Sequence, residues 1–326
     1  MRNSRRRLLL VALALACVGL TALPAQGTAP GRNGQLVYAR FPTLWVVNAD
    51  GTGEHKLPHL ERSEDSDPDW SPDGSRIAFD RCAEKCEIWT ANPDGPKPKR
   101  LGPNCLRRTD SGCPDRGFPS WSPDAKRIAF GQGTIKGGKI EFSEIFVMNA
   151  NGTGVRQVTH ITTGGKPFAT DVLRPAWSPD GRQLVFEVHN LAGADPPNRH
   201  ALFIVGADGS GLRQVTPWSL NAGDDQDWSP DGKLILFRTV STANRHHGNL
   251  HTIRPDGTRL KRITNYPAPK TVLSPTYSPD GKWIAFARFT DGPYPALFVM
   301  RADGTGVRRV SRNASVNELD WGPRRR

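Results

Sequence analysis

Histidine residues gather in two neighbouring stretches, and imidazole groups with nearby carboxylates suit zinc or manganese. Five of the eight His residues lie between positions 189 and 251. No pair of them has the spacing of a compact metal motif. We therefore expect exposed polar segments that bind a ligand without metal, and a metal-dependent carbohydrate lyase or hydrolase is the alternative. The candidate side chains of these stretches are His189, Arg199, His200, Arg238, Arg245, His246 and His247.

Cysteine is the second residue type with chemistry to offer. Cys82, Cys86, Cys105 and Cys113 follow the first 30 residues, and an even number in an exported chain favours disulfides. We expect two local pairs, Cys82–Cys86 and Cys105–Cys113, because each closes a short segment that has no core of its own. A four-cysteine zinc site is the alternative, although neither spacing is Cys-x-x-Cys.

The sequence offers little else for catalysis. No Gly-x-Ser-x-Gly nucleophile motif is present, and Gly209-Ser210-Gly211 belongs to a tight turn. We predict no catalytic residue, no bound metal and no cofactor.

The elements that must position these residues are repeated. An anchor of the form Trp-Ser-Pro-Asp-Gly recurs, with variants, about every 50 residues, and 326 residues exceed the usual size of a single core. A short apolar strand follows each anchor but the last, as in Arg76-Ile77-Ala78-Phe79. A second pattern of strand, tight turn and strand begins at six positions, the first at Leu44. The anchor aromatic residues are Trp70, Trp121, Trp177, Trp228, Tyr277 and Trp321.

Each repeat predicts four antiparallel strands, which we call a to d. The anchor aromatic ends strand a, Pro-Asp-Gly turns into strand b, a variable segment leads to strand c, and Asp-Gly turns into strand d. Successive apolar residues in strand b indicate burial on both faces. Such units stack in a ring, so we predict an all-β, six-bladed propeller with the anchor Trp residues in the blade core.

The two ends of the repeat region complete one blade. Residues 33–40 have the pattern of strand b without an anchor, and Trp321-Gly322-Pro323 is an anchor without a strand b. We therefore expect a C-terminal strand to join the N-terminal blade and to close the ring.

Because successive strands of a blade run in opposite directions, their connections alternate between the two rims of the propeller. The short a–b and c–d turns form one, the short-turn rim; the b–c and d–a connections form the other, the long-loop rim. Variable loops on a rigid frame usually carry binding, so we place the site on the long-loop rim around the channel mouth. The d–a connections add Arg174 and Asp225 to the candidates. For Asp67, Asp69 and Asp227, which precede anchors, we favour structural hydrogen bonds.

The recurring Trp-Ser-Pro-Asp-Gly and Ala-Asp-Gly-Thr-Gly segments resemble the Pro-Asp, WD40-like repeat of TolB-like propellers over residues 31–323. TolB is the periplasmic propeller of the Tol system, and related propellers accompany some peptidases. The resemblance implies a binding or scaffold role. TolB also has an N-terminal α/β domain, whereas here the repeats begin soon after residue 30, which puts a Tol–Pal role in doubt.

Residues 1–30 have the pattern of an export signal. Arg2, Arg5, Arg6 and Arg7 precede an apolar run from Leu8 to Leu20, which is too short for a convincing membrane span. The start also matches a twin-arginine signal, and both this and the general secretory route stay open, as does lipidation at Cys17. Residues 324–326 form a basic tail.

Charge and localisation complete the expectations. The formal net charge is +12, and without residues 1–30 it is about +8, which favours an anionic envelope polymer as partner. No basic stripe with interleaved aromatic residues indicates nucleic-acid binding. We predict a monomeric, extracytoplasmic bacterial propeller that binds a protein or an envelope polymer and does not span the membrane.

Overall fold

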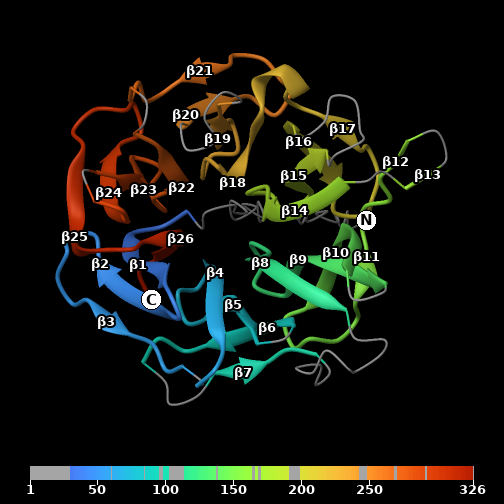
Figure 1. Cartoon of the computed structure of the whole chain (residues 1–326), viewed down its shortest axis with the longest axis horizontal. Helices are drawn as coiled ribbons and strands as arrows, with labels where there is room; N and C mark the ends of the chain where they lie inside the picture. Colours follow the sequence, from blue (N-terminus) through green and yellow to red (C-terminus); the bar gives the residue numbers. More distant parts are fainter. Residues whose placement is uncertain are drawn as a thin grey trace, which may run out of the picture.

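The computed structural model describes residues 30–325, except 60, 84, 95–97, 103–113, 137–138, 164–165, 168–169, 191–198, 242–247, 268–269 and 291. Within these ranges the chain forms six four-stranded antiparallel sheets. The sheets surround a central axis as the blades of a propeller (Figure 1). The predicted all-β class and six-bladed architecture are confirmed. Residues 1–29 of the proposed export signal lie outside the described residues, so that signal stays a prediction.

Each blade runs from strand a next to the axis to strand d at the periphery. Blade 1 contains β26 (Asn317–Pro323), β1 (Asn33–Arg40), β2 (Thr43–Asn48) and β3 (His55–Lys56). Blade 2 contains β4 (Glu64–Trp70), β5 (Ile77–Cys82), β6 (Cys86–Ala91) and β7 (Lys99–Arg100). Blade 3 contains β8 (Asp115–Trp121), β9 (Arg127–Lys136), β10 (Lys139–Asn149) and β11 (Arg156–Gln157).

The other three blades follow the same order. Blade 4 contains β14 (Thr170–Trp177), β15 (Gln183–Asn190), β16 (Arg199–Gly206) and β17 (Arg213–Gln214). Blade 5 contains β18 (Ala222–Trp228), β19 (Ile235–Val240), β20 (Gly248–Ile253) and β21 (Lys261–Arg262). Blade 6 contains β22 (Val272–Tyr277), β23 (Trp283–Phe289), β24 (Pro295–Arg301) and β25 (Arg308–Ala314). The connections add a small hairpin, β12 (Thr162–Thr163) with β13 (Lys166–Pro167), and a 3-10 turn, η1 (Trp218–Leu220).

The Pro-Asp-Gly segment forms the a–b turn that the sequence predicts. In blade 2 the N–H of Gly74 donates to the carbonyl of Ser71 at 2.8 Å, and Gly74 has a φ of 69°. The Ser71 hydroxyl donates to Asp73 at 2.6 Å and accepts from the backbone N–H of Arg76 at 2.9 Å. This turn places strand b directly beside strand a, so the anchor aromatic residue packs between blades.

The core lies between successive blades. Strand b of blade 2 buries Ile77, Ala78 and Phe79, as expected for a strand covered on both faces. Trp177 and Trp228 are almost completely buried and pack in the clusters around blades 4 and 5. The anchor Trp residues are therefore core residues, as predicted.

The ring closes through the C-terminal strand. β26 pairs antiparallel with β1 in blade 1, with Trp321 opposite Leu36 and Leu319 opposite Tyr38 (Figure 1). This strand supplies strand a, while β1, β2 and β3 supply b, c and d, as the sequence predicted. Each strand a also contacts strand a of both neighbouring blades, so the six first strands surround the axis. In the described part of the chain, no helix combines the length and hydropathy needed to cross a bilayer.

Candidate functional site

The axial channel is lined by residues from the six first strands, and it holds a cavity of about 120 Å³. The third residue before each anchor lies at the same level of the channel, nearer the long-loop rim. In five blades this residue lies in a bulge of the a–b pairing and has a φ between 46° and 61°. A bulge changes the direction in which a side chain points. Five of these six residues line the cavity, and Ser274 does not. We call these the channel-ring residues: Asp67, Phe118, Arg174, Asp225, Ser274 and Glu318.

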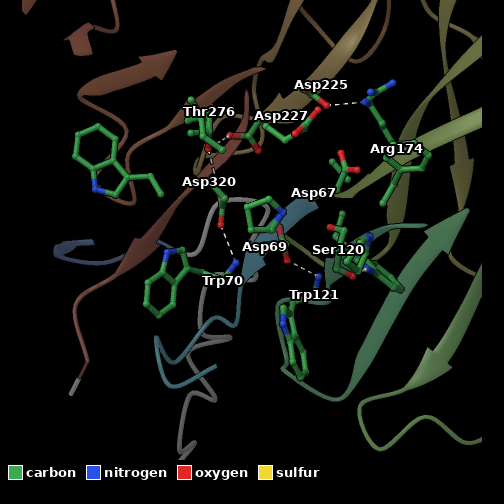
Figure 2. A pocket seen from close by; sticks show the side chains of 18 of the residues that line it. Asp67, Asp69, Trp70, Ser120, Trp121, Arg174, Asp225, Asp227, Thr276 and Asp320 are labelled. Atoms are coloured by element: carbon green, nitrogen blue, oxygen red, sulfur yellow. Dashed lines mark hydrogen bonds and ion pairs between the residues drawn. The ribbon is translucent and has the colours of Figure 1, made fainter. Parts of the chain in front are cut away.

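The residue directly before three anchors is an Asp with a structural role. Its carboxylate accepts a hydrogen bond from the backbone N–H of the anchor residue in the next blade. Figure 2 shows this bond for Asp320 with Trp70 and for Asp69 with Trp121. The bonds therefore join neighbouring blades, and the structural role expected for Asp69 and Asp227 is confirmed. The three pairs are Asp320 with Trp70 at 2.8 Å, Asp69 with Trp121 at 2.6 Å, and Asp227 with Tyr277 at 2.7 Å.

Arg174 is the one cation among the described residues that line the channel, beside six carboxylates. Its Nε lies 2.7 Å from Oδ1 of Asp225 (Figure 2). The hydroxyl of Ser274 donates to Oδ2 of the same carboxylate at 2.6 Å. Asp67 has no hydrogen bond or ion pair within the described chain. Oε2 of Glu318 is buried and has no hydrogen-bond partner there. The channel therefore has more acidic groups than basic groups to pair with them.

Two further carboxylates lie just outside this ring, on strand b. Asp80 and Glu187 each follow a buried Phe, and each fits against a glycine of the next blade. A Cβ on Gly117 would lie 2.9 Å from Oδ2 of Asp80, and one on Gly223 would lie 2.7 Å from Cδ of Glu187. The glycines therefore make room for acidic side chains between the blades.

A chain of charged contacts links Glu187 to the channel. The buried Glu187 carboxylate contacts Nδ1 of His200 and lies 4.0 Å from Nη1 of Arg174. Burial alone would raise the pKa of Glu187, but the hydrogen bond and charge of His200, together with the charge of Arg174, hold it below its ordinary value. Glu187 is therefore ionised at neutral pH.

For Asp80, Glu318 and Asp67, burial outweighs the hydrogen bonds and opposite charges that would lower the pKa. It raises the pKa of Asp80 to about 6 and that of Glu318 to about 7, where the charge of Asp225 adds to the effect. Burial and the charges of Asp80 and Glu318 also raise the pKa of Asp67 well above its ordinary value. The negative charge of the channel thus increases as the pH rises through 6 and 7.

Glu318→Gln should stabilise the fold at pH 8. A raised folded pKa means that Glu318 contributes stability below its unfolded pKa of about 4.5, and that this contribution is lost as the pH rises through about 7. The amide removes the cost of an ionised buried group. We expect the free energy of unfolding to increase by about 1–2 kcal/mol at pH 8 and to change little at pH 4.5. Urea unfolding at both pH values measures this, with the exposed Glu61→Gln as the control; equal gains in both variants would contradict it.

The structure brings several predicted site residues together. His189 and His200 face each other across β15 and β16, with ring centroids 4.2 Å apart and planes inclined by 8°. His200, Arg174 and Asp225 belong to one connected group through Glu187. Arg199 starts β16 opposite Asn190.

The assignment of these residues to loops was wrong. His189, Arg199 and His200 lie on β15 and β16, because strands b and c of blade 4 extend farther than the apolar pattern indicates. Arg174 and Asp225 likewise lie on strand a, in β14 and β18. Arg238 lies in β19 and is buried, with an Nη2 hydrogen bond of 3.3 Å to Thr271, and burial lowers its pKa to about 10. It is therefore a packed side chain of the blade 5–blade 6 contact.

Other predicted residues lie outside the described residues: Arg245, His246, His247, Cys105 and Cys113. Cys82 and Cys86 form the expected disulfide, which closes the b–c connection of blade 2. Among described residues, the one group that brings three potential metal ligands within 4.8 Å is Asp80 with these two cysteines, whose sulfur atoms are bonded to each other. The described histidines form no comparable group.

Sequence reasoning missed Asp80, Glu318 and Asp320 as channel residues. Glu318 and Asp320 stand three and one positions before the last anchor, so alignment of the anchors would have found them. Asp80 follows the Phe of strand b, where blade 4 has Glu187 and the other blades have Ala, Gly or Arg. The sequence signal for these three acidic residues is therefore their position within the repeat, relative to the anchor or to the Phe of strand b.

The ring of six four-stranded blades with an axial channel defines the class of this protein as a six-bladed β-propeller. The crystal structure of TolB from Acinetobacter baumannii has a TM-score of 0.65 and 19% identity, over 91% of this chain and 68% of that chain. No protein-family model matches the chain. The sequence relatives below and this structure fit a TolB-like propeller family, as the repeats predicted.

Two curated relatives illustrate how much of each protein is shared. Tol-Pal system protein TolB from Francisella tularensis subsp. mediasiatica is 22% identical over 299 residues, which cover 88% of this chain and 61% of the relative. Uncharacterized peptidase YuxL from Bacillus subtilis is 24% identical over 231 residues, which cover 68% of this chain and 29% of the relative. The chain therefore spans less than two thirds of the length of both.

Proposed function

We propose that this chain is an exported, non-catalytic binding propeller whose channel accepts a cationic segment of a partner protein from the long-loop rim. The observation that carries this proposal is the charge of the channel. Six carboxylates and one guanidinium line it in a chain whose formal net charge is +12. A cleft of one sign attracts and orients groups of the other sign, so lysine or arginine side chains or an amino terminus suit this site.

The relatives support a protein as the partner. The Francisella relative is by name a component of the Tol-Pal system, and a component of such a system works with other proteins. An extracytoplasmic location is supported by the predicted signal in residues 1–30 and by the Cys82–Cys86 disulfide, a bond typical of oxidising compartments. The anionic envelope polymer stays a prediction, because the channel itself favours a cation.

The enzyme alternative receives less support. His200 contacts the buried carboxylate of Glu187, and His189 stacks on it, so both rings have structural contacts. A metal-dependent lyase would bind a stoichiometric transition metal and lose polysaccharide cleavage in His200→Ala. Elemental analysis of the purified protein and that variant would distinguish the two functions.

A tetra-arginine peptide is a suitable probe for the channel. We expect calorimetric titration at pH 8 to show binding that weakens at least about tenfold in Asp67→Asn/Glu318→Gln, because these two carboxylates lack partners of their own. Binding should also weaken from pH 8 to pH 5.5, since Glu318 and Asp80 gain protons over this range.

Asp231→Asn/Glu61→Gln is the control for that titration, because it removes the same charge from exposed positions outside the channel. It should retain most of the affinity. If the control weakened the peptide as much as the channel variant, the attraction would come from the overall charge and the channel would not be the site. Capture of partners from a cell-envelope extract should show the same difference between the two variants.

A further inference from the structure

We infer that the groove between blades 3 and 4 on the short-turn rim is a binding site for oxyanions, with phosphate groups of a polymer or a lipid headgroup as the ligand class. This site lies apart from the channel lining and attracts the opposite charge. The inference goes beyond the proposed channel function and does not depend on it. Either site can fail its test without affecting the other.

Three guanidinium groups line this groove, which has a volume of about 510 Å³. Arg127 and Arg156 come from blade 3, and Arg182 comes from the a–b turn of blade 4. Asp208 is the one carboxylate among the described lining residues, so the lining has a net charge of +2. A concave surface with this charge attracts anions.

Two of the guanidinium groups have donors available for a ligand. Arg127 lies over the ring of Trp177, with its Cζ 4.5 Å from the ring centroid, and its side chain donates no hydrogen bond within the described chain. This cation–π contact restrains the guanidinium and uses none of its N–H donors. Arg182 is exposed, and its side chain has no hydrogen bond or ion pair with the described residues.

The third guanidinium is positioned by the next blade. Nη2 of Arg156 donates to the carbonyl of Ala207 at 2.5 Å, which holds this side chain across the groove. The carboxylate of Asp208 is already engaged within its own turn, because Oδ1 accepts from the backbone N–H of Ser210 at 2.9 Å and from its hydroxyl at 2.7 Å. The hydrogen bonds from Ser210 and the charge of Arg156 lower the pKa of Asp208, so this carboxylate offsets one of the three positive charges of the groove.

The chemistry of three arginines favours phosphate over a simple halide. Each guanidinium presents a planar fork of N–H donors that matches two oxygens of a phosphate or carboxylate. Two exposed aliphatic residues are neighbours in the sequence of residues that line the groove. Val155 precedes Arg156 in blade 3, and Leu212 follows Gly211 in blade 4. The ligand group is therefore an oxyanion presented on a larger molecule.

The adjacent groove provides a matched comparison. Between blades 4 and 5, Gln183 stands where blade 3 has Arg127, and Arg213 and Lys233 stand at the places of Arg156 and Arg182. Nη1 of Arg213 donates to the carbonyl of Pro255 at 2.7 Å, as Arg156 does to Ala207. Neutralising the same two positions in either groove thus removes equal charge, and in the control groove it also removes the exposed salt bridge of Lys233 with Asp231 at 2.9 Å, which Arg182 lacks.

The experiment compares Arg156→Gln/Arg182→Gln with Arg213→Gln/Lys233→Gln. Calorimetric titration with polyphosphate at fixed ionic strength should show at least about tenfold weaker binding for the first variant and less than about threefold for the second. Thermal melts verify that both remain folded. Arg182→Lys, which keeps the charge and removes the fork, should give an intermediate affinity.

The source of the phosphate group is tested separately with vesicles. Cosedimentation with phosphatidylglycerol vesicles, and not with phosphatidylcholine, would identify a lipid headgroup, whereas binding of polyphosphate alone would identify a soluble polymer; both support the site. Equal weakening of polyphosphate by the two double variants would overturn it, because the attraction would then be diffuse. Absence of binding by the unmodified protein to either probe would also overturn it.

Discussion

Removal of residues 314–326 should abolish cooperative folding. The truncation deletes β26 and therefore strand a of blade 1, and it exposes the edge of β1. It also removes the buried side chains of Val316, Leu319 and Trp321. Burial of each such side chain contributes about 1.5–3 kcal/mol, so the loss approaches the total stability of about 5–15 kcal/mol that a domain has. Thermal unfolding followed by circular dichroism should show a much lower or absent transition.

A shorter truncation controls for the loss of residues as such. Removing Arg324–Arg326 keeps β26 and deletes mainly the contacts of Arg325 with two turns of blade 2, at Gly74 in the a–b turn and at Asp94 in the c–d turn. Exposed contacts of this kind contribute about 0–1 kcal/mol. The melting temperature should therefore change by only a few degrees. A 314–326 truncation that melted like the full chain would show that ring closure does not stabilise the protein.

Arg174→Gln is expected to destabilise the protein strongly at pH 8 and less at pH 5.5. Carboxylates surround this guanidinium, and although burial alone would lower the pKa of Arg174, the charges of Asp225 and Asp67 raise it above its ordinary value. Removal leaves these groups without a counter-charge. We expect a loss of about 2–4 kcal/mol at pH 8, below the full cost for a completely buried pair because Arg174 is partly accessible.

The pH dependence of that loss follows from the sign of the carboxylate shifts. Glu318, with a pKa of about 7, and Asp80, with a pKa of about 6, take up protons as the pH falls to 5.5, so the repulsion that Arg174 relieves decreases. Urea unfolding at both pH values measures the difference. The double variant Arg174→Gln/Asp225→Asn should recover part of the stability at pH 8. An equal loss at both pH values would contradict the electrostatic explanation.

The repeat alone was sufficient to predict the fold. Each anchor marks the end of strand a, and the missing halves at residues 33–40 and 321–323 predict the closure that β1 and β26 form. Local turn chemistry determined these elements, because Pro, Asp and Gly each favour a defined backbone conformation. No long-range information was needed beyond the requirement that the blades cover one another.

The candidate site was only partly predictable, for two physical reasons. Asp67, Arg174 and Glu318 belong to three different blades, so their proximity depends on the closed ring and not on sequence spacing. The bulges of strand a also determine which side chains face the channel. The positive φ of Asp67 and of Phe118 cannot be predicted from the residue type. The histidine stretches pointed to loops of blades 4 and 5, whereas His189, Arg199 and His200 lie on strands β15 and β16.

The bulges of strand a reduce the stability of the backbone at the positions that present side chains to the channel. A non-glycine residue in the left-handed region costs about 1–2 kcal/mol, and five of the six channel-ring positions adopt it. Glycine at any of them would relieve the backbone and at the same time remove the side chain that faces the channel. Random mutation selected for heat resistance alone should therefore replace Asp67, which lacks a partner among the described residues, before Arg174, whose counter-charge outweighs the backbone cost, whereas selection for binding should keep the ring and change which side chain each blade presents. The propeller thus offers one position in each blade at which the specificity of a single channel can be altered without rebuilding the blades.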